Sequence, residues 1–69
     1  MEKSVAEKLL RAALALDAQF GAIDIAVSQI PDEAERKGFT TALGDLIRGV
    51  NDGFIRPLVR QFPNLDPDT

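Results

Sequence analysis

The fold of this chain is decided by residues 6–30, AEKLLRAALALDAQFGAIDIAVSQI. Apolar side chains recur in this stretch at alternating steps of three and four residues: Ala6, Leu9, Ala13, Leu16, Phe20, Ile23, Val27 and Ile30. This spacing is the a/d seam of consecutive heptads, which aligns these side chains along one stripe of an α-helix. The stretch therefore predicts a long helix that packs lengthwise against another helix.

Both ends of this first helix carry a sequence signal. Ser4 and Glu7 have the spacing of a capping box, in which each side chain bonds the backbone amide of the other residue. At the far end Pro31 follows the seam, and the residue before a proline is driven out of the α region. We therefore expect the first helix to span about residues 4–30, with Gly21 inside it.

A second helix is predicted directly after this proline. Asp32 precedes a new run of helix-forming residues and is a favourable N-cap. Pro57 lacks an amide hydrogen and crowds the carbonyl of Gly53, so we expect a kink between these two residues and a helix that continues to Phe62. The alternative is a helix that ends near Val50 and is followed by a short third helix. The apolar positions of this half are Phe39, Leu43, Leu46, Ile47, Val50, Phe54, Leu58 and Phe62.

The short connection at Pro31 predicts that the two helices are antiparallel neighbours. We expect one helical-hairpin domain over residues 1–62 and a flexible C-terminal tail over residues 63–69. Apolar positions match when Leu9 faces Phe54, Ala13 faces Val50, Leu16 faces Ile47 and Phe20 faces Leu43. The same register predicts ion pairs between the helices: Glu7 with Arg56, Asp17 with Arg48 and Asp24 with Lys37.

The size of the chain favours assembly with a partner. A 69-residue chain has a small core, and this one contains no cysteine for a disulfide and no histidine for a conventional zinc site. The first helix carries a second apolar stripe that a single neighbouring helix cannot cover. We expect an all-α hairpin that forms a homodimeric four-helix bundle, with Leu10, Leu14 and Ile25 facing the second chain or another protein.

The residues with catalytic potential form no recognisable active site. Ser4 and Ser28 have no histidine to activate them. Four aspartates recur in pairs seven residues apart, and such carboxylates can hold magnesium or calcium through oxygen ligands. We expect them to be solvated or ion-paired instead, and we expect no catalytic residue, no cofactor and no metal ion. These aspartates are Asp17, Asp24, Asp45 and Asp52.

Two alternative functions remain open at this point. Arg48, Arg56 and Arg60 recur on the second half and present donor groups suited to an anionic ligand, as in a ligand-binding or enzymatic bundle. A DNA-binding accessory protein would use residues 51–53 as a turn and residues 54–62 as a recognition helix. The net charge of −3 disfavours binding to nucleic acid or to an anionic membrane.

Among these possibilities the sequence favours one function and one location. No window approaches the roughly 20 apolar residues of a membrane-spanning helix, and the opening Met-Glu-Lys-Ser does not look like a signal peptide. We expect a cytoplasmic helical module that regulates or connects other proteins by direct contact. Its partners would be a second copy of the chain and another protein, without nucleic acid or membrane.

Overall fold

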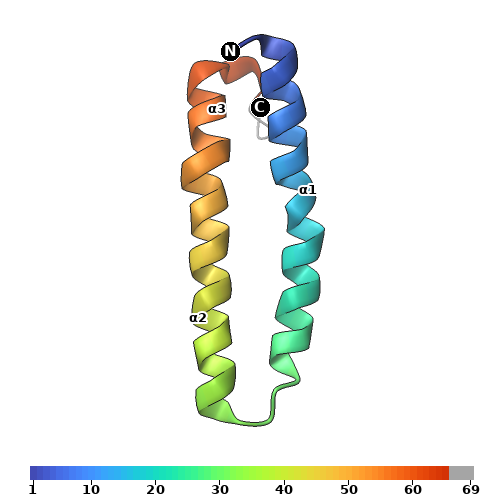
Figure 1. The fold of residues 1–69 in the computed structure, drawn as a ribbon, viewed down its shortest axis with the longest axis vertical. Helices are drawn as coiled ribbons and strands as arrows, with labels where there is room; N and C mark the ends of the chain where they lie inside the picture. The colour runs from blue at the N-terminus through green and yellow to red at the C-terminus, as the bar shows by residue number, and fades with distance from the viewer. Residues whose placement is uncertain (66–69) are drawn as a thin grey trace.

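The computed structural model describes residues 1–65, and this part of the chain is entirely helical apart from short connections (Figure 1). The helices are α1 (Lys3–Ser28), α2 (Glu33–Val50) and α3 (Arg56–Gln61). A π-helical turn, η1 (Asn51–Ile55), joins α2 to α3, and a 3-10 turn, η2 (Pro63–Leu65), follows α3. α1 lies beside α2 and runs in the opposite direction, so the predicted all-α hairpin is confirmed.

The two helix starts differ in how they are capped. Asp32 caps α2 as predicted, because its carboxylate accepts a hydrogen bond from the backbone amide of Glu35 at 2.9 Å. The capping box predicted for α1 is wrong: this helix begins at Lys3, and no side chain bonds its first turn. Ser4 is the second residue of the helix and therefore lies inside it rather than at its cap.

The connection between the helices is tied down by an arginine of α2. α1 ends at Ser28, two residues before the predicted end, and the chain passes Pro31 before it turns into α2. The Arg36 guanidinium donates a hydrogen bond to the carbonyl oxygen of Ile30 at 2.9 Å. The Ile30 carbonyl lies in the connection and has no hydrogen-bond partner within a helix, so this bond satisfies it.

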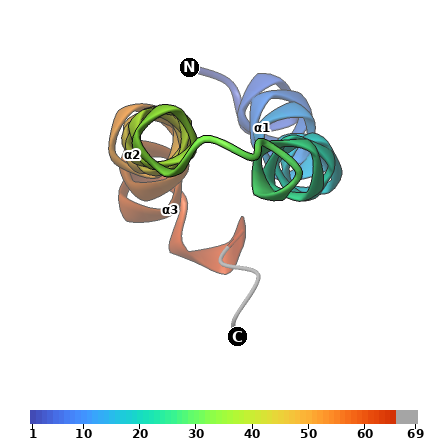
Figure 2. The same ribbon diagram turned by 90° about the horizontal axis from the view of Figure 1, so that it is seen from below.

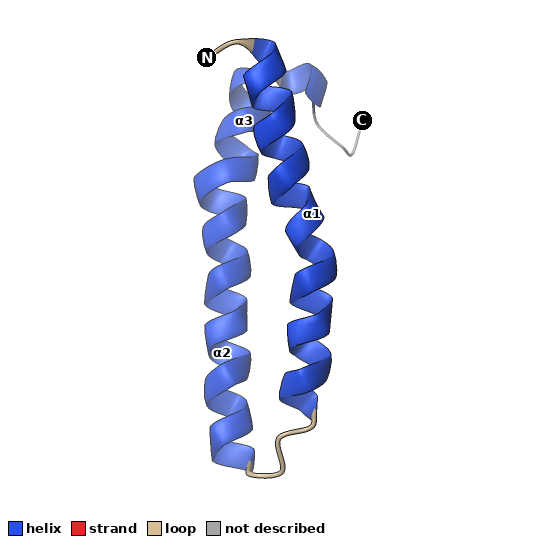
Figure 3. Ribbon diagram, turned by 45° about the vertical axis from the view of Figure 1, so that its right-hand side comes forward, coloured by secondary structure: helices blue, strands red, loops and turns tan. Residues whose placement is uncertain are grey.

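The second helix does not stop at Gly53. It passes from α2 into α3 through η1, in which the backbone amide of Arg56 donates to the carbonyl oxygen of Asn51, five residues earlier. A proline has no amide hydrogen and clashes with the carbonyl four residues before it, so a wider turn ahead of Pro57 accommodates both defects. The distortion predicted between Gly53 and Pro57 is thus a π turn, seen as a sideways step of the ribbon in Figure 3.

The π turn also sets the direction of the residues that follow it. Each residue of an ordinary α-helix rotates the next side chain by about 100°, and a wider turn rotates it by less. Leu58 lies eight residues after Val50, a spacing that would point the two side chains in different directions in an ordinary helix. Both residues are buried, because the π turn returns Leu58 to the side that faces α1.

The best-covered part of the core lies at the open end of the hairpin. Leu10, which we expected to face a second chain, is buried there in its own chain together with Ala6 and Leu58. α3 and η2 lie over this side of the hairpin (Figure 2). Their residues Leu58 and Leu65 pack in or against the cluster and shield Leu10 from solvent. The residues packed around the cluster are Leu9, Ile55, Phe62 and Leu65.

The position of η2 extends the packed part of the chain beyond the predicted domain. Leu65 belongs to the segment predicted as a flexible tail, yet it packs against the core cluster. The packed part of the chain therefore reaches Leu65, three residues past Phe62. The rest of the predicted tail, residues 66–69, lies outside the described residues.

The remainder of the hairpin is only thinly covered. Ala13 and Val27 of α1 and Leu43 and Val50 of α2 are buried between the helices. Other residues of the predicted seam are not: Leu16 and Ile23 retain 40% and 41% of their exposure. Two helices side by side touch along one line, so apolar residues beside that line stay in contact with water.

Candidate functional site

One broad side of the hairpin carries a set of large, half-exposed apolar side chains, which we call the apolar face. Its members are 40% to 53% exposed. They follow one another at steps of 11 and 7 residues on α1. On the second helix the steps are 7 and 8 residues, the longer one reaching into the π turn. These spacings place them on one flank of each helix. They are Val5, Leu16 and Ile23 of α1, Phe39 and Leu46 of α2, and Phe54 of η1.

The apolar face contains a groove between the two helices. Leu9, Ala12, Ala13 and Leu16 line it from α1, and Val50 and Phe54 line it from the second helix. Its volume is about 290 Å³, and its walls are apolar. The groove unites Leu9 and Ala13 with Phe54 and Val50, the residues that the predicted register sets opposite each other. It exists because two alanines line α1 where the second helix widens into the π turn.

The middle of the apolar face is free of charge. On α1 the residues interleaved with Leu16 and Ile23 on the same flank are Ala12, Gln19 and Ala26. On α2 the corresponding positions beside Phe39 and Leu46 are Ala42 and Gly49. The charged residues closest to this flank, Lys8 and Glu35, lie toward its two ends. A partner on this face would therefore meet apolar atoms along most of its length.

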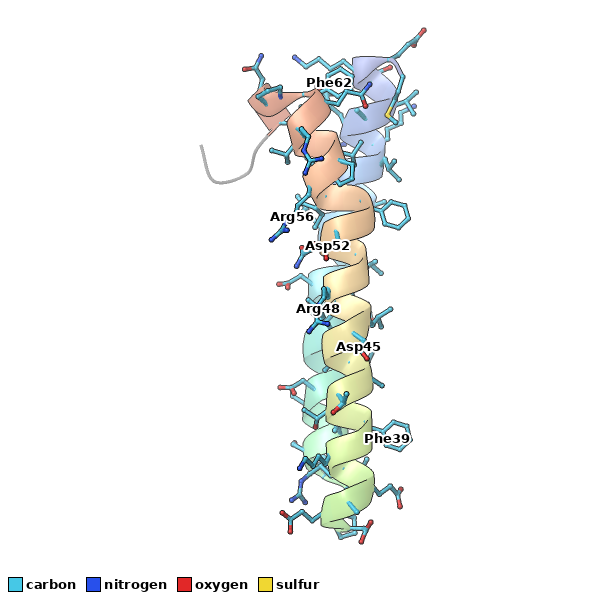
Figure 4. The ribbon with its side chains drawn as sticks, turned by 90° about the vertical axis from the view of Figure 1, so that its left-hand side faces the viewer. Phe39, Asp45, Arg48, Asp52, Arg56 and Phe62 are labelled. Atoms are coloured by element: carbon cyan, nitrogen blue, oxygen red, sulfur yellow. The ribbon has the colours of Figure 1, made fainter. Side chains whose placement is uncertain are left out.

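The opposite side of the second helix is charged. Figure 4 shows Arg48 and Arg56 pointing to one side of this helix and Phe39 pointing to the other. Arg48 pairs with Asp45 at 3.5 Å, and Arg56 pairs with Asp52 at 3.4 Å. All four side chains are more than half exposed, so these are surface ion pairs within one helix. The second helix thus has one charged and one apolar side.

The predicted ion pairs between the helices are wrong. Asp45 and Asp52 lie one turn from their arginines and bind them locally, in place of Asp17 and Glu7 on α1. Arg48, Arg56 and Arg60 do not line the apolar groove, nor do they line a second hollow near the open end of the hairpin. The anion site predicted from these arginines receives no support from their geometry.

The other two residues predicted for a protein contact lie away from the apolar face. Leu14 and Ile25 lie on the opposite flank of α1 and are 38% and 63% exposed. Leu14 lines a second hollow of about 450 Å³ near the open end. The walls of this hollow are partly polar and comprise Glu7, Leu10, Arg11, Leu14, Asn64 and Leu65.

Features typical of other site classes are missing from residues 1–65. No group of three or more carboxylates is close enough there to hold a metal ion. No polar or charged side chain is buried within these residues. Among the same residues, none of the helices combines the length and the apolarity that crossing a bilayer requires.

Comparison with known proteins gives no assignment. No protein-family model matches the chain, and neither the curated proteins nor the solved structures contain a significant match. The surface of the molecule is therefore the basis for inferring its function.

Sequence reasoning missed most of the apolar face. It assigned Leu16, Ile23, Leu46 and Phe54 to the contact between the helices, because they follow the heptad pattern. The signal that distinguishes them is their flank: on each helix they lie to one side of the buried residues, which are Ala13 and Val27 on α1 and Leu43 and Val50 on the second helix. On a helical wheel the exposed residues fall to one side of these buried residues, so a wheel plot would have separated the exposed flank from the buried seam.

Proposed function

We propose that this chain is a non-catalytic protein–protein interaction module that acts by self-association. In this proposal two hairpins bring their apolar faces together and form a four-helix bundle. The observation that carries the proposal is the apolar face itself, six large side chains that a single chain leaves 40% to 53% exposed.

The energy of such a contact is large relative to the stability of a small domain. Full burial of a large aliphatic or aromatic side chain stabilises by ~1.5–3 kcal/mol, so covering the remaining half yields roughly 1 kcal/mol for each residue. Six residues on each copy contribute to the interface. The gain outweighs the cost of association only if many of them are covered together, which favours a partner that matches the whole face.

The proposed bundle leaves the opposite flank of α1 free. Leu14 and Ile25 remain on the outer surface of such a dimer, and we assign to them the contact with a further protein. The two surfaces thus have separate roles. The apolar face holds the two copies together, and the outer flank of α1 binds the further protein. No observation favours the anion-binding or DNA-binding alternatives over this proposal.

The test is the absolute mass in solution, measured by light scattering after size exclusion across a dilution series. The expected result is a species of twice 7.5 kDa. Leu46→Asp, which sets a charge in the middle of the apolar face, should convert it to a folded monomer. Ile25→Asp is the matched control, because Ile25 is even more exposed but lies on the other flank. A wild-type chain that stays monomeric and folded at high concentration would refute the proposal.

A further inference from the structure

We infer that two copies pack apolar face to apolar face in antiparallel orientation, so that Phe39 of each copy fills the groove beside Phe54 of the other. The inference rests on the self-association proposed above. It adds the orientation of the copies and the residues that meet, neither of which follows from self-association alone.

A second copy fits the dimensions of this surface. The molecule measures 46 × 20 × 17 Å, so its broad side covers roughly 900 Å². A stable interface of standard size buries about 800 Å² on each partner. A second copy also presents the same charge-free strip, so no buried charge is left without a partner when the two strips meet. A single amphipathic helix from another protein would cover only about half of the width.

The positions of Phe39 and the groove set the orientation. Phe39 is 53% exposed and precedes the two groove residues Val50 and Phe54 by 11 and 15 residues. At 1.5 Å per residue, the groove lies roughly 16 to 22 Å further along the same helix. A two-fold axis that crosses the helices halfway between them brings each Phe39 over the groove of the other copy. One symmetry operation therefore satisfies both contacts at once.

The location of this axis follows from the register of the hairpin. The point halfway between Phe39 and the groove lies near Leu46 of α2. Because Leu9 and Ala13 share the groove with Phe54 and Val50, the point of α1 at the same height lies between Leu16 and Gln19. In this arrangement α1 packs on α1 of the second copy, and α2 packs on α2. Gln19 of one copy then lies next to Gln19 of the other.

The parallel arrangement leaves the groove unfilled. A two-fold axis along the helices sets each groove at the same height as the groove of the second copy, so the two hollows of about 290 Å³ face each other. Protein interfaces pack as densely as protein interiors, and a void of this size forfeits the contacts of every side chain around it. The parallel arrangement also keeps Phe39 away from the groove beside Phe54 of the second copy. Packing therefore selects the antiparallel dimer.

A single-cysteine variant tests the orientation directly, since the wild-type chain has no cysteine. Gln19 is exposed and polar, so Gln19→Cys leaves the apolar contacts intact. Near the antiparallel axis the two cysteines come within disulfide distance, and mild oxidation should link most of the protein into covalent dimers. Lys8→Cys is the control: it lies 11 residues from Gln19, so its two copies are separated by roughly 30 Å and should not cross-link.

The outcomes separate this inference from the proposed function. A dimer by light scattering that Gln19→Cys fails to cross-link would overturn the antiparallel orientation and leave self-association standing. Efficient cross-linking of Lys8→Cys would overturn it as well. A monomer by light scattering would remove both proposals together.

The position of Phe39 has its own spectroscopic test. The chain contains no tryptophan or tyrosine, so Phe39→Trp creates a single fluorophore. Its emission should shift to shorter wavelength as the concentration rises through the dimer transition, because the indole enters an apolar groove. Ile25→Trp, on the outer flank, should show no shift. A concentration-independent Phe39→Trp spectrum in a protein that light scattering shows to be dimeric would contradict the groove contact.

Discussion

Leu10 of α1 and Leu58 of α3 lie in the same buried cluster, although 48 positions separate them in the sequence. They are 5% and 3% exposed and, with Ala6, form the most enclosed part of the molecule. The contact holds the end of the second helix against the start of the first. It also explains why Leu10 is unavailable to a partner, whereas Leu14, one turn further, remains partly exposed.

Truncation of Leu58 should therefore destabilise the fold strongly. We expect Leu58→Ala to lower the free energy of unfolding by about 2–5 kcal/mol, the range for a buried leucine, because it leaves a cavity beside Leu10. Ile25→Ala is the matched control and should cost less than about 1 kcal/mol, since Ile25 is largely exposed. Chemical denaturation at one fixed protein concentration measures both. Similar losses for the two variants would contradict the placement of the core at the open end.

The two helix starts should respond differently to loss of their predicted caps. Asp32→Ala removes the hydrogen bond to the amide of Glu35 and should cost about 1 kcal/mol. Ser4→Ala removes no cap bond and introduces a better helix former, so its stability should be unchanged or slightly raised. Thermal unfolding followed by circular dichroism compares them. A loss for Ser4→Ala as large as that for Asp32→Ala would show that Ser4 caps α1 after all.

Two glycines of α2 provide a matched pair for the proposed interface. A methyl group added to Gly44 or to Gly49 would meet nothing within 4 Å in the single chain. Each substitution by alanine should therefore stabilise the helix by about 1 kcal/mol. Gly49 adjoins the apolar face and Gly44 lies on the other flank, so only Gly49→Ala should raise the dissociation constant of the dimer. If the two variants changed that constant equally, Gly49 would have no role in close approach of the copies.

The surface arginines should contribute little. Arg56→Ala breaks an exposed pair one turn along the helix, and such pairs contribute only a few tenths of a kcal/mol. We expect an almost unchanged midpoint of unfolding and no measurable binding of inorganic phosphate to the wild type by calorimetry. Phosphate binding that Arg56→Ala abolishes would revive the anion-binding alternative.

The sequence was a reliable guide to the helices and an incomplete one to their surfaces. Pro31 and Asp32 mark the turn by local chemistry, so the hairpin was predictable from them. The heptad pattern names the residues near the contact but not how much of each side chain the partner helix covers. Leu16 and Ile23 show the difference, because they follow the pattern and still face water.

Long-range folding at the open end was the part that local signals could not predict. Leu10 belongs to a secondary apolar stripe, and nothing beside it in the sequence indicates that Leu58 and Leu65 return to cover it. The ion pairs were mispredicted for a related reason. Arg48 and Arg56 each have an aspartate within one turn, and a partner on the same helix requires less ordering of two long side chains than one across the hairpin.

The π turn makes this helix equivalent to an ordinary α-helix that carries one inserted residue. Removing a single residue from Asn51–Ile55, for example Asp52, would let the chain run as regular α-helix into Pro57. Leu58 would then lie seven residues after Val50 and keep close to its present direction, while Phe54, three residues after Val50, would turn away from α1 and from the groove. A change in the length of this five-residue segment would thus alter the groove while leaving the core in place. Insertions and deletions there can adjust the groove, as substitutions can.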